Sequence, residues 1–249
     1  MTVLVAIPYY RCEPFIDEAV GHVLAQTYTD LVCLVAGDGE VPVTKHRDDR
    51  LVLCAWHVNR GAPFTQQAML LGSPFAWYAP HGADDWADPE YLERLMARES
   101  PAVGSRSLWF HYDDGTTVRR DNDPAYVEFG VFSRDLLRSI GGYGVDRLCG
   151  QDTLLFEQLL PRLVPITWND EPGYHKRMRE GSLTHNPDTG FGSAYRQEVV
   201  WHNAEVAAMC TRIGFDDVAT IRTYRETLVP IGLRDELQDR ADDVARALA

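Results

Sequence analysis

The sequence predicts an α/β protein with a doubly wound, mostly parallel central sheet and helices on both faces. Apolar runs alternate with segments of helical periodicity over residues 3–98. The runs are continuously apolar, as expected for strands that are buried on both faces. The first strand, helix and second strand fit within about 35 residues, which is typical of a βαβ unit with a right-handed crossover.

The N-terminal part of the chain contains four expected strands and three expected helices. The strands are expected at residues 3–8, 31–36, 51–58 and 75–79, and the helices at residues 13–24, 63–71 and 89–98. Apolar residues of the first helix recur at intervals of three and four, so it should bury one face. Pro63 stands at the start of the second helix, and Asp88 is expected to cap the third.

The regular alternation ends near residue 100. Residues 103–112 and 117–118 predict a hairpin around an Asp-Gly turn. Further strands are expected at residues 126–132 and 163–168, and helices at residues 133–140, with Ser133 as its cap, and at residues 152–160. No strand is expected after residue 190, and residues 233–248 predict an amphipathic helix. We expect residues 1–190 to form one α/β domain and residues 191–249 to be its helical C-terminal extension.

Composition limits the possible partners and compartment. The net charge is 24 − 37 = −13, which disfavours a nucleic-acid partner. No apolar run approaches the roughly 18 residues that indicate a transmembrane helix, and the N-terminus lacks the features of a signal peptide. The five cysteines are scattered and form no CxxC pair, so neither a zinc site nor a disulfide framework is indicated. A cytoplasmic location is expected.

Two adjacent carboxylates, Asp84 and Asp85, follow the expected strand at residues 75–79. Open α/β sheets bind ligands at the carboxyl ends of their strands. Carboxylate oxygens there suit Mg²⁺ or Mn²⁺, and such a cation suits a diphosphate. The alternative is helix capping, but two adjacent carboxylates repel each other unless a cation or a helix dipole compensates.

Four sequence blocks support a more specific interpretation. Residues 5–11 read VAIPYYR and are followed by AQTY at residues 25–28, residues 35–39 read VAGDG, and residues 83–92 read ADDWADPEYL. The fourth block joins GGY at residues 141–143, QD at residues 151–152 and YHKRMREGSLT at residues 174–184. In this order, the blocks resemble the inverting glycosyltransferases of the GT-A fold, specifically family 2.

This resemblance implies a nucleotide site on the first three strands. Pro8, Tyr9 and Tyr10 would pack against the base, Asp38 would accept a hydrogen bond from a ring nitrogen of the base, and Arg60 would reach the base or the diphosphate. From the residues alone, Asp38 also suits a Gly-Asp-Gly turn, Arg60 a solvated turn, and the tyrosines a core or rim.

The resemblance also implies a metal site. Asp84 would contact the ribose, Asp85 would bind the cation, and His175 would complete the metal shell, although a packed histidine is an equally good interpretation. Gly82 stands where the family has its first carboxylate. The acidic motif is therefore incomplete.

The catalytic base implied by the resemblance is Asp152, preceded by Gln151 in place of the usual Glu. A carboxylate within reach of the acceptor hydroxyl would take its proton, whereas the alternative role is a helix cap. The basic residues at positions 176, 177 and 179 would neutralise a diphosphate leaving group, and residues 178–191 are the expected lid.

The sequence therefore predicts a transferase that moves a sugar from a nucleoside-diphosphate donor, UDP- or dTDP-linked, to a hydroxyl of a glycan, a lipid-linked sugar or a small molecule. Two alternatives stay open. One is an inactive nucleotide-sugar-binding relative, since Gly37, Gly82 and Gln151 replace acidic residues of the family pattern. The other is a nucleotidyltransferase, disfavoured because no Gly-rich loop follows the first strand. The C-terminal helices are expected either to cover the acceptor site or to form a homodimer.

Overall fold

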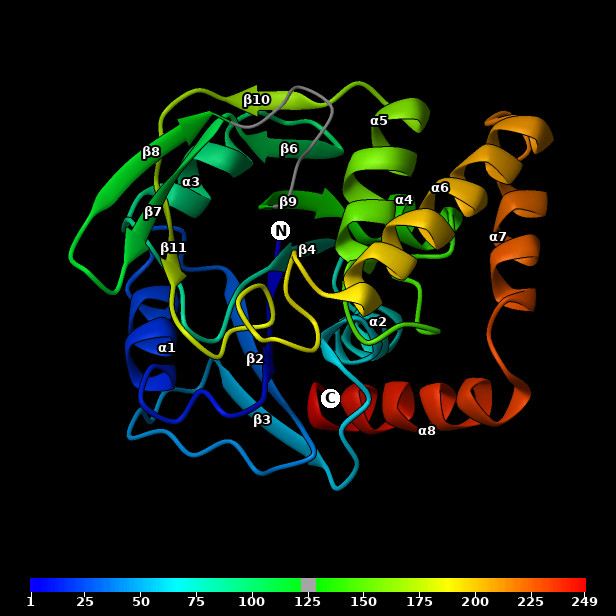
Figure 1. Cartoon of the computed structure of the whole chain (residues 1–249). Coiled ribbons are helices and arrows are strands. Elements are labelled where there is room, and N and C mark those ends of the chain that lie inside the picture. Colours follow the sequence, from blue (N-terminus) through cyan, green and yellow to red (C-terminus); the bar gives the residue numbers. More distant parts are fainter. Residues whose placement is uncertain (122–128) are drawn as a thin grey trace.

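The computed structural model describes residues 1–121 and 129–249 and contains a seven-stranded sheet, a smaller four-stranded sheet and surrounding helices (Figure 1). The large sheet has the order β10-β6-β9-β4-β1-β2-β3. Its strands are β10 (Thr167–Asn169), β6 (Ala102–Ser105), β9 (Gly130–Ser133), β4 (Trp77–Pro80), β1 (Val3–Tyr9), β2 (Leu31–Asp38) and β3 (Leu51–Trp56). β3, β2, β1 and β4 run parallel, and β9 is antiparallel to both of its neighbours. This arrangement confirms the predicted mostly parallel α/β sheet.

The first strand shows why helices cover both faces of the sheet. Leu4 and Ala6 of β1 join one core cluster, whereas Val3, Val5 and Ile7 join another. Successive side chains of a strand point to opposite faces, so a continuous apolar run needs cover on both. One face is covered by α1 (Ile16–Leu24) and α3 (Tyr91–Met96). The other is covered by α2 (Ala62–Gly72), α4 (Arg134–Ser139), the π-helical segment η1 (Thr153–Leu159) and α5 (Leu160–Leu163).

The smaller sheet has the order β5-β11-β7-β8 and departs most from the prediction. It consists of β5 (Trp86–Ala87), β11 (Tyr174–Met178), β7 (Ser107–Tyr112) and β8 (Thr117–Asp121). The β7–β8 hairpin confirms the expected turn, but the single strand expected at residues 103–112 is wrong. The chain leaves the large sheet after β6, whose residues are all buried, and starts β7 in the other sheet. β11 was not predicted, because its sequence YHKRM contains no apolar run.

Two further expectations need correction. The strand expected at residues 163–168 begins only at Thr167, because α5 and its C-terminal turn occupy the preceding residues. Asp88 does not cap α3: the helix has Glu90 at its N-cap, without a side-chain capping bond. The Ser133 cap is confirmed, since its side chain accepts a hydrogen bond from the Leu136 N–H. The strand expected at residues 126–132 lies partly outside the described residues, which include β9.

From residue 194 onward the chain is helical, as expected. It forms α6 (Ala194–Ile213), α7 (Val218–Thr227) and α8 (Ile231–Ala247), and α8 packs along α2 and β3 (Figure 1). Val206, Ile221 and Val244 belong to the same core cluster as Leu4 of β1. No helix in the described part of the chain combines the length and the apolar character that a membrane crossing requires.

A buried arginine fastens α8 to the sheet. Arg240 is only 3% exposed; its Nη1 donates to Asp38 Oδ1 at 3.1 Å. Its Nη2 donates to Glu236 Oε1 and to the Val58 carbonyl oxygen, each at 2.7 Å. The guanidinium therefore joins the end of β2, the turn after β3 and its own helix.

Aromatic rings complete the surroundings of this cation. The Arg240 guanidinium carbon lies 4.9 Å from the Trp56 ring centroid and 4.8 Å from that of Phe64. Trp56 Nε1 also donates to Asp243 Oδ2 at 3.0 Å. Ring faces attract a desolvated cation, so the site offsets part of the cost of burying Arg240.

We expect Arg240→Ala to lower the free energy of unfolding by about 3–5 kcal/mol, because it leaves the buried Asp38 carboxylate without its cation. Urea denaturation monitored by circular dichroism measures this change. Arg246→Ala on the same helix is the matched control, since the Arg246 side chain is 71% exposed and should contribute less than about 1 kcal/mol. Equal effects of the two substitutions would contradict the role assigned to Arg240.

Candidate functional site

The parallel strands bring most of the predicted site residues to one edge of the large sheet. Pro8 and Tyr9 lie at the carboxyl end of β1, and Asp38 ends β2. Arg60 follows β3, and Asp84 lies in the segment that follows β4. Because these four strands are adjacent and parallel, their carboxyl ends lie at the same edge, where open α/β sheets bind ligands.

Asp85 is a buried carboxylate held by β11. It is 5% exposed; Tyr174 Oη donates to its Oδ2 at 3.0 Å and the Arg177 N–H donates to its Oδ1 at 2.9 Å. Tyr174 Oη also accepts the Gly82 N–H at 2.9 Å. β11 therefore fixes both the carboxylate and the turn that carries it.

Gly82 has a steric reason to lack a side chain. A Cβ atom built at this position would lie 2.3 Å from Asp85 Oδ2. A first carboxylate of the acidic motif would therefore displace Asp85 from its position. The absence of a side chain at Gly82 therefore makes room for the Asp85 carboxylate in its observed position.

Asp84 is paired with an arginine. Arg179 Nε lies 2.7 Å from Asp84 Oδ2, and Arg179 Nη2 donates to the Cys12 sulfur at 3.3 Å. Arg177 Nε donates to the Asp84 carbonyl oxygen at 3.0 Å and its guanidinium pairs with Glu18. Two arginines of the predicted basic cluster thus lie directly at the acidic pair.

Burial and charge change the protonation of this site. Burial, followed by the negative charge of Asp84, raises the pKa of Asp85 to about 7, although Lys176 and the Arg177 N–H act in the opposite direction. Burial also lowers the pKa of His81 to about 4, so that this ring is neutral near pH 7. At neutral pH the pair therefore carries less negative charge than two exposed carboxylates would.

Asp38 and Arg60 are both engaged by α8. Asp38 is 2% exposed and accepts the N–H groups of Arg60 on Oδ1 and of Gly61 on Oδ2, besides the Arg240 bond. The Arg60 guanidinium lies 2.8 Å from the Glu236 carboxylate. Burial raises the pKa of Asp38, while the hydrogen bonds and Arg240 oppose that rise. The turn after β3 is thus held by Asp38 from one side and by α8 from the other.

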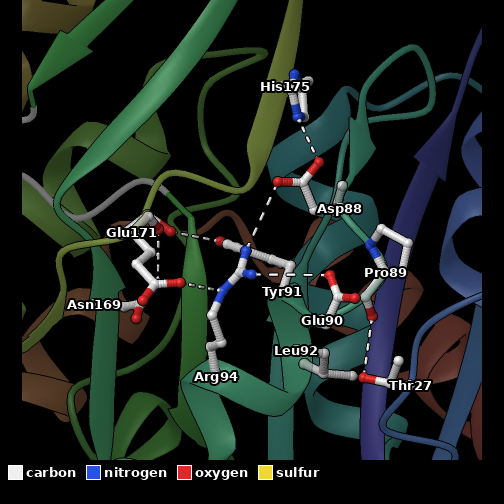
Figure 2. Close-up of polar contacts among 12 residues, drawn as sticks. Thr27, Asp88, Pro89, Glu90, Tyr91, Leu92, Arg94, Asn169, Glu171 and His175 are labelled. Atoms are coloured by element: carbon white, nitrogen blue, oxygen red, sulfur yellow. Dashed lines mark hydrogen bonds and ion pairs between the residues drawn. The ribbon is translucent and has the colours of Figure 1, made fainter.

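The structure places His175 in a different network from Asp85. Its Nε2 lies 3.1 Å from Asp88 Oδ1 and its Nδ1 lies 2.9 Å from His111 Nε2. The His175 ring stacks on Trp86 with centroids 5.2 Å apart. Figure 2 shows His175 directed toward Asp88, with Arg94 on the other side of that carboxylate. Both His175 ring nitrogens are therefore used within the protein.

Asp152 precedes η1 and is partly exposed, whereas the neighbouring Gln151 is fully buried. The loop before it packs on the carboxyl edge of the large sheet, because a Cβ atom at Gly61 would lie 2.6 Å from the Leu148 carbonyl oxygen. The expected lid continues from β11, and Arg196 Nε donates to the Thr189 carbonyl oxygen at 2.9 Å. Asp152 thus follows a loop that contacts the turn bearing Arg60.

The sequence did not predict that Tyr174 contacts Asp85 or that Arg240 of α8 binds Asp38. Tyr174 begins one of the blocks quoted above, but that block gave no indication that its hydroxyl binds Asp85. Arg240 had a detectable signal, because it lies on the apolar face of α8 together with Leu237, Ala241 and Val244. A charged residue on a buried helix face indicates a partner.

A cation at the acidic pair would use few protein ligands. Within residues 1–121 and 129–249, no group of three or more His, Cys, Asp or Glu side chains could hold a metal ion. The two adjacent carboxylates are nevertheless hard oxygen donors, and burial, followed by the negative charge of Asp84, raises the pKa of Asp85. The donor set fits a cation that takes its other ligands from a diphosphate and water.

The fold matches crystal structures of S. aureus TarS. No family model matches this chain, and no curated protein matches it in sequence. TarS 1-349 aligns with a TM-score of 0.57 at 14% identity, over 99% of this chain and 89% of that chain. The complex of TarS 1-349 with UDP-GlcNAc aligns with a TM-score of 0.57 at 15% identity, over 73% of this chain and 60% of that chain. A further crystal structure of TarS aligns at 14% identity over 72% of this chain, and the alignment spans only 37% of that TarS chain. The likeness confirms the predicted fold class.

We expect Asp85 to make the free energy of unfolding depend on pH. Its pKa is about 7 in the folded protein and ordinarily 3.8, so the folded state retains a proton that the unfolded state loses between these values. The stability of the wild type should therefore fall relative to Asp85→Asn as the pH rises from about 4 to about 7, by at most a few kcal/mol. Urea titrations at each pH, without divalent cations, measure the difference. Parallel curves for the two proteins would rule out the buried, raised-pKa carboxylate.

Proposed function

We propose that this chain is a glycosyltransferase that moves a sugar from a nucleoside-diphosphate donor to an acceptor hydroxyl, with inversion at the anomeric carbon. The observation that carries the proposal is the pair Asp84–Asp85 at the carboxyl edge of the sheet. Arg177 of β11 and Arg179, which follows β11, bind this pair. The fold it shares with TarS supports the same proposal, since crystal structures of TarS 1-349 contain UDP and UDP-GlcNAc.

The donor would lie along the ends of β1, β2 and β4. Tyr10 is 40% exposed beside the buried Tyr9, so its ring is accessible for stacking on a base. Asp38 Oδ2 accepts the Gly61 N–H, and the second lone pair of that oxygen suits the ring N–H of uracil or thymine. We therefore propose a UDP- or dTDP-sugar as the donor.

The arginines would be the first groups to neutralise the negative charge of the donor diphosphate. Arg179 pairs with Asp84 and is only partly exposed, so a diphosphate entering here would exchange one anionic partner of Arg179 for another. Guanidinium groups suit phosphate oxygens because they offer parallel N–H donors. A bound Mn²⁺ or Mg²⁺, held by Asp85, would neutralise further charge on the departing diphosphate.

Asp152 would act as the general base. A carboxylate that accepts the proton of the acceptor hydroxyl makes its oxygen a better nucleophile as the bond to the anomeric carbon forms. Attack from the face opposite the diphosphate inverts the anomeric centre in a single displacement. Asp152 is only partly buried, as a residue that an acceptor must reach requires.

One observation favours a nucleotide-sugar-binding protein with little turnover as the second candidate. A Cβ atom at Gly37 would lie 1.9 Å from the Glu40 backbone carbonyl oxygen, so this acidic position of the family pattern is sterically closed. A Cβ atom at Gly82 would lie 2.3 Å from Asp85 Oδ2, so a carboxylate there would require the Asp85 side chain to move. Calorimetric titration with UDP, with and without Mn²⁺, tests binding separately from turnover. Absence of any UDP binding would contradict both candidates.

We expect Asp152→Asn to lower the rate of UDP release from UDP-GlcNAc in the presence of acceptor by about 10²–10⁴-fold, because it removes the proton acceptor. UDP affinity should stay unchanged. Asp135→Asn is the matched control, since the Asp135 side chain is 78% exposed on α4. A full rate in Asp152→Asn would remove this residue from the mechanism.

Asp85→Ala tests the cation separately. It should abolish the gain in UDP affinity that Mn²⁺ gives the wild type. Calorimetry at several Mn²⁺ concentrations measures this gain. An unchanged Mn²⁺ effect in the variant would show that Asp85 does not bind the cation.

A further inference from the structure

A cavity of about 290 Å³ lies between the loop that precedes η1 and the C-terminal helices. Its lining combines Gln67 of α2 and Gln151 with His202 of α6, Arg225 of α7 and Arg234 of α8. Neither the acidic pair nor Asp38 and Arg60 contribute to it. Its volume is close to the lower end of the range for small-molecule sites, roughly 300–1,000 Å³.

The lining carries an excess of positive charge in an otherwise acidic chain. Four arginines line it, together with the carboxylates Asp146 and Glu226. Both carboxylates already have cationic or imidazole partners: Asp146 lies 2.8 Å from His202 Nε2, and Glu226 lies 3.6 Å from Arg222. Arg138 and Arg234, both exposed side chains at the cavity, therefore add positive charge that these carboxylates do not neutralise.

The most deeply placed of these cations is Arg225, which is 6% exposed. Its Nη1 donates to the Ile140 carbonyl oxygen, and its Nη2 donates to the Gly142 carbonyl oxygen at 2.8 Å. Burial lowers the pKa of Arg225 to about 10, against the opposing charges of Cys210 and Asp146. A desolvated guanidinium held by neutral carbonyls is stabilised when an anion binds beside it.

Gln151 adds an acceptor that no residue in the described ranges satisfies. It is fully buried, and its Nε2 donates to Asn203 Oδ1 at 3.1 Å. Its Oε1 has no hydrogen-bond partner among the described residues and lies against Gly144, where a Cβ atom would approach it to 1.9 Å. A buried carbonyl oxygen without a donor is costly, so a ligand hydroxyl here would be favourable.

We propose that this cavity binds a small phosphate ester with free hydroxyl groups, such as a sugar phosphate. The arginines would bind the phosphate and Gln151 Oε1 would accept a hydroxyl. The site is separate from the proposed donor site, and its occupancy requires no sugar transfer.

The test is calorimetric titration of the full chain with glucose 6-phosphate, inorganic phosphate and glucose. Glucose 6-phosphate should bind saturably and should not be displaced by UDP. The double substitution Arg138→Ala and Arg234→Ala should weaken binding by about tenfold or more, because two cations are lost. Arg212→Ala is the matched control, since Arg212 is an exposed arginine of α6 outside the lining, and it should bind as the wild type does.

Gln151→Leu tests the hydroxyl contact independently of charge. It should weaken glucose 6-phosphate more than inorganic phosphate, since only the ester offers hydroxyl groups. Much weaker phosphate binding would support the ester as the ligand, and phosphate binding close to that of the ester would contradict the hydroxyl contact assigned to Gln151. The proposal fails if no ligand binds, if glucose binds as well as its phosphate, if UDP displaces the ester, or if the double variant binds normally.

Discussion

Buried carboxylates at the ends of parallel strands are the constraint on which the rest of this structure depends. Asp38 ends β2 and Asp85 follows β4, and both are almost inaccessible to solvent. A buried anion is tolerated only when donors or cations surround it. Asp38 receives two backbone N–H groups and Arg240, whereas Asp85 receives Tyr174 Oη and the Arg177 N–H. The donors come from distant parts of the chain, so these two residues organise β11 and α8.

This constraint explains which parts of the fold the sequence predicts. β1 and β2 are continuous apolar runs, and their burial on both faces follows directly from that pattern. β11 has polar side chains and forms because β7 and β5 pair with it and because its backbone N–H at Arg177 binds Asp85. Its position is therefore determined by partners more than 50 residues away in the sequence, which local periodicity does not contain.

The sequence likewise predicts only part of the candidate site. Positions after strands predict the edge that Asp38, Arg60 and Asp84 share, because parallel strands carry their carboxyl ends to one place. The partner of each side chain depends on tertiary packing. Arg60 pairs with Glu236, and His175 pairs with Asp88 and stacks on Trp86. A residue type and its spacing indicate what a side chain can bind, but the packed structure decides which of several available partners it meets.

The segment at residues 141–152 connects the two sites physically. Leu148 packs against Gly61 at the carboxyl edge of the large sheet, Gln151 lines the cavity that also contains Arg225, and Asp152 follows at the start of η1. Because Gln151 and Asp152 are adjacent, a hydrogen bond from a ligand to the side-chain oxygen Oε1 of Gln151 would restrain the backbone that carries the proposed base. α7 contributes to the same restraint, since Arg225 binds the carbonyl oxygens of Ile140 and Gly142. The C-terminal helices thus hold this segment at its beginning through Arg225 of α7 and near its end through the bond between Asn203 of α6 and Gln151.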